Sequence, residues 1–234
     1  MLPAKMTRVV MAVMFMCMSM SCADGTRPSG TPATSLATGG TVIDFEKHEL
    51  HKTPSDWTPA LTGGGGAVEW IVVEDASSPV GKKVLAQVSA DDTDNRFPIC
   101  TFNDFVAKDV DVSVRFKAMA GKVDQAGGVI VRFKDKDNYY VTRANALEDN
   151  VRLYKVVNGS RKQFAGVNAK VSSHEWHTLR LIAKGAHFEV IFDGKSLFTA
   201  DDDTLSDPGR AGLWTKADSI THFDEPHFVN DDQK

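Results

Sequence analysis

The chain has 234 residues, 42% of them hydrophobic, and a formal net charge of −4 at pH 7. This length and composition suit one sizeable domain behind a processed leader. The sequence has no block of basic residues and no arginine-rich face, so we expect neither nucleic-acid binding nor polybasic docking to a membrane.

The first 21 residues have the pattern of an export signal. Lys5 and Arg8 precede an apolar run of about ten residues, and small residues lie just before Cys22. The run is shorter than the roughly 18–20 residues of a membrane span. The pattern resembles a bacterial lipoprotein signal, which predicts cleavage before Cys22 and a lipid on that cysteine. The alternative is ordinary secretion with cleavage nearby, since two methionines replace the usual Leu and Ala of such signals.

Residues 22–40 are rich in Gly, Pro, Ser and Thr and are predicted to form a flexible linker. A domain at 41–234 would then stand off the membrane of the periplasm or cell envelope. Without residues 1–21 the chain has 25 basic and 31 acidic residues, a net charge of −6. Cys100 is the one cysteine left to the domain, so we expect no disulfide there, and its apolar setting predicts a buried, inert thiol.

Residues 41–234 have the two-residue periodicity of β-strands and no helical spacing. The segment from Gly127 to Val156 is the clearest example and is predicted to form the centre of an antiparallel sheet. The predicted strands cover residues 41–46, 67–73, 83–88, 97–102, 109–117, 127–133, 139–143, 151–156, 175–183, 188–192, 196–199, 209–216 and 219–228.

Turn signals and alternation give the fold class. Asp193 and Gly194 between two alternating segments are a strong hairpin signal. In residues 109–117 one side carries Val110, Val112, Val114 and Phe116, and the other carries Asp111, Ser113, Arg115 and Lys117. About a dozen short strands without a long helix predict an all-β fold, in which two antiparallel sheets pack face to face as a sandwich.

Eight motifs follow one another along residues 41–230. They are Asp-Phe-Glu at 44–46, Gly-Gly-Val-Ile-Val-Arg-Phe at 127–133, Asp-Asn-Tyr-Tyr at 137–140, Arg-Leu-Tyr-Lys-Val-Val-Asn-Gly at 152–159, Trp-His-Thr-Leu-Arg at 176–180, Phe-Asp-Gly-Lys at 192–195, Gly-Leu-Trp-Thr-Lys-Ala-Asp-Ser at 212–219 and Phe-Asp at 223–224. In this order they resemble the concanavalin A-like lectin/glucanase jelly roll. More narrowly they resemble bacterial 3-keto-disaccharide hydrolase-like domains, also labelled family 16 glycoside hydrolase-like.

The resemblance implies a jelly-roll sandwich and, as one activity, cleavage of oxidised disaccharides. It also suggests a structural Ca²⁺ between the first and last strands, with Glu46 and Asp224 among its ligands. Carboxylate oxygens suit calcium, which takes roughly six to eight oxygen ligands.

The sequence lacks the catalytic motif of the glucanases that this fold resembles. Those enzymes place two catalytic carboxylates on one strand as Glu-x-Asp-x-Glu. The nearest alternation here is Asp109, Asp111 and Ser113, without either outer glutamate. We therefore expect these residues to be polar positions on a strand and not a glucanase site.

A polar surface on the central sheet is the predicted ligand site. Pairing Val131 with Val141 across the charged turn places Arg132 beside Tyr140 on the opposite face. With this register Arg143 lies on the other face of the sheet, so it is not included among the predicted ligand residues.

A later strand adds Trp214 and Lys216 to this prediction, because they share one face. If that strand joins the same sheet, an aromatic ring, a phenol and two cations meet on a concave surface. Aromatic faces stack on sugar C–H groups, and Arg and Lys donate to hydroxyls. The alternative is that Trp214 packs against a loop and that Arg132 pairs with a surface carboxylate.

Three functions remain open from the sequence. The first is a carbohydrate-interacting sandwich held at the cell envelope by lipid. The second is a glycoside hydrolase acting on 3-keto-disaccharides or related glycosides. The third is an interaction module that binds no sugar.

Overall fold

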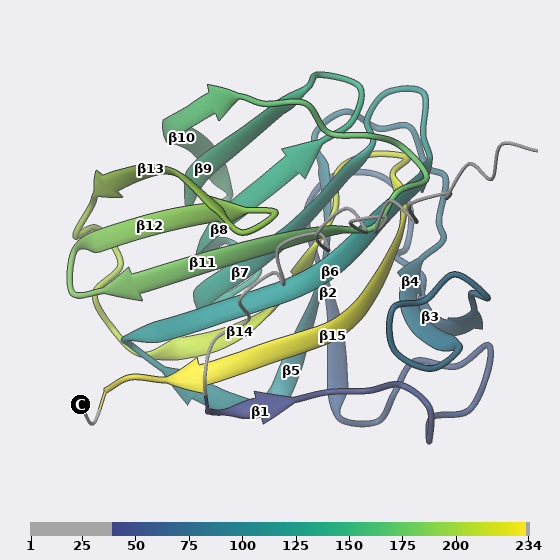
Figure 1. The fold of residues 1–234 in the computed structure, drawn as a ribbon. Helices are drawn as coiled ribbons and strands as arrows, with labels where there is room; N and C mark the ends of the chain where they lie inside the picture. The colour runs from purple at the N-terminus through teal and green to yellow at the C-terminus, as the bar shows by residue number, and fades with distance from the viewer. Residues whose placement is uncertain (1–38, 233–234) are drawn as a thin grey trace, which may run out of the picture. The chain divides into compact units, whose positions relative to one another are not determined.

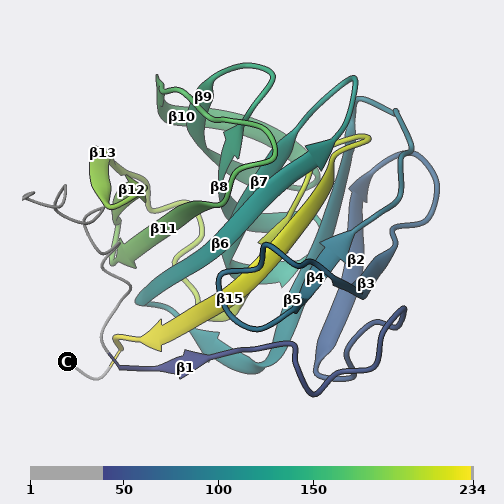
Figure 2. The ribbon, with the colours of Figure 1, turned by 45° about the vertical axis from the view of Figure 1, so that its right-hand side comes forward.

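The computed structural model describes residues 39–232, and within this range the chain forms strands, turns and loops but no helix. The strands make two antiparallel sheets that lie face to face (Figures 1 and 2), which confirms the predicted β-sandwich. None of the described residues forms a helix that would be long and apolar enough to cross a membrane. The predicted leader, Cys22 and linker residues up to 38 lie outside the described range.

The first sheet has eight strands in the order β13-β12-β11-β6-β15-β4-β3, with β1 paired to β15 at an edge. Its strands are β1 (Thr41–Val42), β3 (Trp70–Glu74), β4 (Lys83–Gln87), β6 (Val110–Ala120), β11 (His177–Lys184), β12 (His187–Phe192), β13 (Lys195–Asp201) and β15 (Ile220–Asn230).

The second sheet has seven strands in the order β10-β9-β8-β7-β14-β5-β2. Its strands are β2 (Trp57–Gly63), β5 (Arg96–Ala107), β7 (Ala126–Asp135), β8 (Asn138–Asn145), β9 (Asn150–Val157), β10 (Ser160–Asn168) and β14 (Gly209–Trp214). The sequence pattern does not predict β2 or β10. Both are edge strands with mixed, partly exposed residues, so neither has the clear alternation of a half-buried strand.

The core between the sheets follows from the alternation in β6. Val112, Val114 and Phe116 are fully buried in the large apolar cluster between the sheets. Arg115 and Lys117 point the other way and pair with carboxylates of neighbouring segments. This is the arrangement that the alternating sequence predicts.

The seven-stranded sheet carries a second apolar cluster on its other side. Its buried members are Phe97, Ile99, Ala126, Ile130, Tyr139, Val141, Tyr154, Val156 and Trp214. These residues alternate along their strands with members of the first cluster, so this sheet is apolar on both faces. We call the side that points away from the eight-stranded sheet the outer face.

Cys100 of β5 lies in the cluster between the sheets and is fully buried and free, as predicted. Burial raises the pKa of its thiol well above the usual value. The reactive thiolate form is therefore disfavoured.

A Gly127→Ala variant tests the packing of the two sheets. A Cβ at this position would lie 2.4 Å from Cδ2 of Phe116, which projects from the facing sheet. We expect the free energy of unfolding to fall by about 1–3 kcal/mol, as in other overpacked cores, in urea denaturation. Gly64→Ala is the control, because a Cβ there meets nothing closer than 3.9 Å, and it should change stability by less than about 0.5 kcal/mol. Equal losses in both variants would contradict this account.

Candidate functional site

The outer face of the seven-stranded sheet brings aromatic and charged side chains together. Trp214 of β14 lies opposite Ile99 of β5 on one side and Gly128 of β7 on the other. Gly128 lies in turn opposite Arg143 of β8. Because opposed residues share a face of a sheet, Trp214 and Arg143 lie on the same surface, with only the glycine position between them.

Aromatic rings form the floor of this surface. The rings of Phe97 and Trp214 stack, with their centroids 5.5 Å apart and an angle of 20° between their planes. Nε1 of Trp214 donates a 3.3 Å hydrogen bond to the hydroxyl of Tyr139. Burial raises the pKa of Tyr139 to about 12, so this phenol stays protonated. Tyr154 of β9 completes the floor.

Arg161 of β10 lies over this floor. Its Cζ is 4.4 Å from the ring centroid of Phe97, 4.6 Å from that of Tyr154 and 5.7 Å from that of Trp214, all within cation–π range. We call this guanidinium and the three rings the Arg161 cluster. The Arg161 side chain makes no hydrogen bond or ion pair with any residue that the structure describes, and its Nη1 is buried without a partner.

A tight hairpin places Arg161 there. Asn158 and Gly159 both have positive φ angles, 50° and 75°, as a two-residue hairpin turn requires. The turn pairs β10 with β9 and sets Arg161 opposite Val156, whose side chain lies on the outer face. Arg161 is not among the site residues predicted from the sequence, although the Asn-Gly pair after an alternating strand is a signal for this hairpin.

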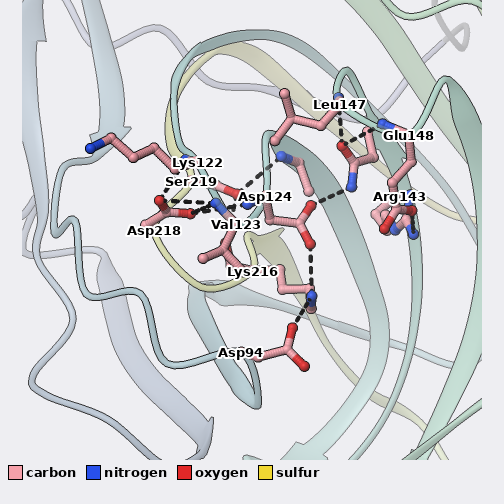
Figure 3. A network of polar contacts seen from close by, with 12 residues as sticks. Asp94, Lys122, Val123, Asp124, Arg143, Leu147, Glu148, Lys216, Asp218 and Ser219 are labelled. Carbon is pink, nitrogen blue, oxygen red and sulfur yellow. Dashed lines mark hydrogen bonds and ion pairs between the residues drawn. The ribbon is translucent and has the colours of Figure 1, made fainter.

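Lys216 is the centre of an ion-pair network on the same face, two residues beyond Trp214 (Figure 3). Its Nζ lies 2.5 Å from Oδ1 of Asp94 and 2.8 Å from Oδ2 of Asp124. Only 1% of the Asp124 side chain is exposed, and its other oxygen accepts a hydrogen bond from Asn145. Burial raises the pKa of Asp124, and the charge of Lys216 opposes that rise.

Arg143 makes the second ion pair of this face, with Glu148 (Figure 3). Its Nη2 donates to Oε2 of Glu148 at 2.8 Å and to the hydroxyl of Tyr154 at 3.1 Å, and its Nη1 donates to Asn150. Arg143 is almost fully buried, whereas 45% of the Glu148 side chain is exposed. Glu148 is therefore a carboxylate that a ligand can reach.

The structure separates two of the four predicted ligand residues from the other two. Trp214 and Lys216 lie on the outer face, but Tyr140 lies in the core between the sheets and Arg132 points towards the same side. The predicted register is one residue out, because Val131 lies opposite Tyr140 and not opposite residue 141.

A bulge at the end of β7 is the reason. The ladder between β7 and β8 is irregular between Val131 and Asp135, and Arg132 has a φ of 50°. The extra residues reverse the alternation that the sequence pattern extends through the turn. As a result Tyr139, and not Tyr140, supplies the phenol of the outer face.

Arg132 and Tyr140 hold loops together. The Arg132 guanidinium donates to the backbone carbonyls of Lys108, Gly185 and Leu205, at 2.9, 2.6 and 3.1 Å. The hydroxyl of Tyr140 accepts from the backbone N–H of Leu205. Three turns that are distant in sequence therefore meet at one buried arginine.

Glu46 and Asp224, the expected calcium ligands, bind one loop instead. Oε1 of Glu46 accepts two 2.7 Å hydrogen bonds from the backbone N–H groups of Lys82 and Lys83. Oδ2 of Asp224 accepts from the hydroxyl of Ser78 and the backbone N–H of residue 80. Residues 39–232 contain no group of three or more Asp, Glu, His or Cys that would hold a metal ion. Two carboxylates that face N–H donors do not fit a calcium site.

Asp111, in the segment compared with the glucanase motif, also has a structural partner. Its carboxylate receives two hydrogen bonds from Arg180 of β11, at 2.7 and 2.5 Å, on the far side of the eight-stranded sheet. It is therefore a polar strand position, as expected, and lies away from the outer face of the other sheet.

Comparison with known proteins bears on the fold. No protein-family model matches the sequence, and no curated protein matches it. Among solved structures, the carbohydrate-binding module CBM66 from Bacillus subtilis is similar at 20% identity and a TM-score of 0.58, over 75% of this chain and 96% of that one. The fold is that of the concanavalin A-like lectin/glucanase jelly rolls.

Two further structures have the same fold. A GH16 protein of the Bacteroides ovatus mixed linkage glucan locus, in complex with its product, matches at 12% identity and a TM-score of 0.56, over 81% of this chain and 99% of that one. Domain 4 of AbnA, a GH43 arabinanase from Geobacillus stearothermophilus in complex with arabinotriose, matches at 13% identity and a TM-score of 0.54, over 81% and 90%. Identities this low establish the jelly roll and not the activity.

An Arg132→Ala variant tests the structural role of this arginine. The change leaves three backbone carbonyls without their donor and empties a buried site, so we expect a loss of about 3 kcal/mol or more in the free energy of unfolding. Urea denaturation measures it. Lys134→Ala, an exposed position on the same bulge, should cost less than about 0.5 kcal/mol. A stable Arg132→Ala protein would contradict the assigned role.

Proposed function

We propose that this domain binds carbohydrate on the outer face of its seven-stranded sheet. The observation that carries the proposal is the Arg161 cluster, in which a partly exposed guanidinium lies over three aromatic rings and has no hydrogen-bond or ion-pair partner among residues 39–232. Similar folds support it, because three of them are named for binding or acting on sugars.

The chemistry of this surface suits a sugar. Apolar ring faces pack on sugar C–H groups, and guanidinium, amide and carboxylate groups bind hydroxyls. Gln163 of β10 lies opposite Tyr154 and is exposed, and Glu148 is exposed on the same face. Trp214 itself is fully buried, so it supports Arg161 from below while the ligand contacts the guanidinium and the exposed polar groups.

Cleavage of 3-keto-disaccharides or related glycosides is the second candidate function. The observation that favours it is a pair of carboxylates near Arg143 whose pKa values move in opposite directions, as in acid–base pairs. Burial raises the pKa of Asp124. Burial also acts to raise the pKa of Glu148, but hydrogen bonding from Asn150 and the charge of Arg143 lower it overall. Asp124 is almost inaccessible, which makes binding the better-supported function.

We also propose, from the leader sequence, that the protein is exported and held at the cell envelope by lipid on Cys22. Two independent signals support this: the apolar run before Cys22 and the polar linker after it.

Binding to a glycan panel tests the first proposal. With the full mature chain in calorimetry we expect Gln163→Ala to weaken sugar binding by about tenfold and Trp214→Ala to abolish it. Trp176→Ala is the control, because this tryptophan contacts Lys117 beyond the eight-stranded sheet and should leave affinity unchanged. Unfolding curves of all variants show whether a loss of binding reflects a loss of folding. Gln163→Ala changes an exposed side chain, so it tests binding without altering the core.

The same samples distinguish the candidate functions. Turnover of 3-keto-glucosides that disappears in Glu148→Gln would establish the hydrolase. An intact fold that binds and cleaves nothing in a broad panel would rule out both and leave an interaction module without a sugar ligand.

Mass spectrometry of the mature N-terminus tests the anchor. In a bacterium that processes lipoproteins, we expect a chain that begins at Cys22 and carries acyl groups, and Cys22→Ala should leave the protein unacylated. An unmodified mature chain that begins after Cys22 would rule the anchor out.

A further inference from the structure

The cations of the outer face differ in whether a carboxylate of the protein neutralises them. Lys216 is held between Asp94 and Asp124. Arg143 is paired with Glu148. Arg161 has no carboxylate within hydrogen-bonding distance among the residues that the structure describes.

Positive charge is concentrated around Tyr154. Arg143 lies 5.7 Å and Arg161 lies 4.6 Å from the centroid of this ring, measured from each Cζ. Arg152 lies opposite Arg143 in the sheet, and within residues 39–232 its side chain donates to the amide oxygen of Asn168 and to no carboxylate.

The guanidinium groups of Arg143 and Arg161 therefore repel each other. Glu148 pairs with Arg143, and Asp124 pairs with Lys216, so neither carboxylate forms an ion pair with Arg161. A further anion beside Arg161 would reduce this repulsion.

The shape of the Arg161 guanidinium suits an anion with two oxygens. A guanidinium group is planar and directs its N–H groups outward in its own plane. Nη1 is buried, so Nε and Nη2 remain to form the two-pronged edge that matches a carboxylate. A neutral hydroxyl would fill one of these positions and leave the charge unpaired.

We propose that the carbohydrate bound at this site is acidic, and that its carboxylate pairs with the unpartnered edge of Arg161. This inference rests on the proposed function, since it places a uronic acid residue on the sugar-binding face. The apolar rings beneath Arg161 strengthen the pair, because they exclude water from one side of the guanidinium.

The test compares oligosaccharides that differ in one charge. Galacturonate, guluronate, mannuronate and glucuronate oligomers, their methyl esters and their neutral hexose counterparts are titrated into the full mature chain. We expect one uronate series to bind at least about tenfold more tightly than its methyl ester, because the ester cannot accept the bidentate pair. Its affinity should fall as salt rises from about 50 to about 500 mM.

Variants assign the effect to one side chain. Arg161→Gln should remove the difference between acid and ester, and Arg161→Lys should keep only part of it, because an ammonium group has no planar fork. Lys162→Gln is the matched control, since it removes the same charge from the next, exposed position of β10 and should keep the preference.

The outcomes separate this inference from the proposed function. If acid, ester and neutral sugars bind equally, or if Arg161→Gln keeps the preference for the acid, the acidic ligand is ruled out while sugar binding stands. If no sugar of any charge binds, both the inference and the proposed function fail.

Discussion

The seven-stranded sheet is apolar on both faces, and only one face has another sheet to cover it. On the inner side Val129 and Val131 pack into the cluster shared with the eight-stranded sheet. On the outer side Trp214 and Phe97 would meet water if nothing covered them. The Arg161 side chain is part of this cover: it lies over the rings of Phe97 and Trp214 and is itself partly exposed. The arrangement of the outer face follows from this requirement.

Charges next to an apolar layer are costly to desolvate, and pairing with an opposite charge offsets this cost. Such pairing occurs at Lys216, which two carboxylates hold, and at Arg143, which Glu148 and Tyr154 hold. Burial of Asp124 raises its pKa, and Asn145 and Lys216 keep both of its oxygens in contact with donors. These networks fix the polar border of the aromatic floor, so the outer face is a defined surface and not a set of mobile side chains.

Two arginines show how the same residue type takes opposite roles in one sheet. Arg132 donates to three backbone carbonyls and ties turns together inside the domain. Arg161 donates to no described residue and is partly exposed above buried rings. The difference comes from local backbone geometry: a bulge turns Arg132 inward, and an Asn-Gly hairpin brings the edge strand that carries Arg161 beside the aromatic floor. Residue type alone therefore did not identify the unpartnered cation.

The sequence by itself determined the sandwich, because side chains in a strand alternate between faces, and the alternation of Val112 and Phe116 with Ser113 survives any choice of partner strand. It also determined that Trp214 and Lys216 share a face, since they are two residues apart. It could not determine the partner of Tyr140, because a bulge shifts the register without a clear mark in residue type. Nor could it show which cation lies over Trp214, since Arg161 reaches that ring only when strands β10, β9, β8, β7 and β14 are paired in this order. Contacts across a sheet depend on strand order and register, which only the tertiary structure sets.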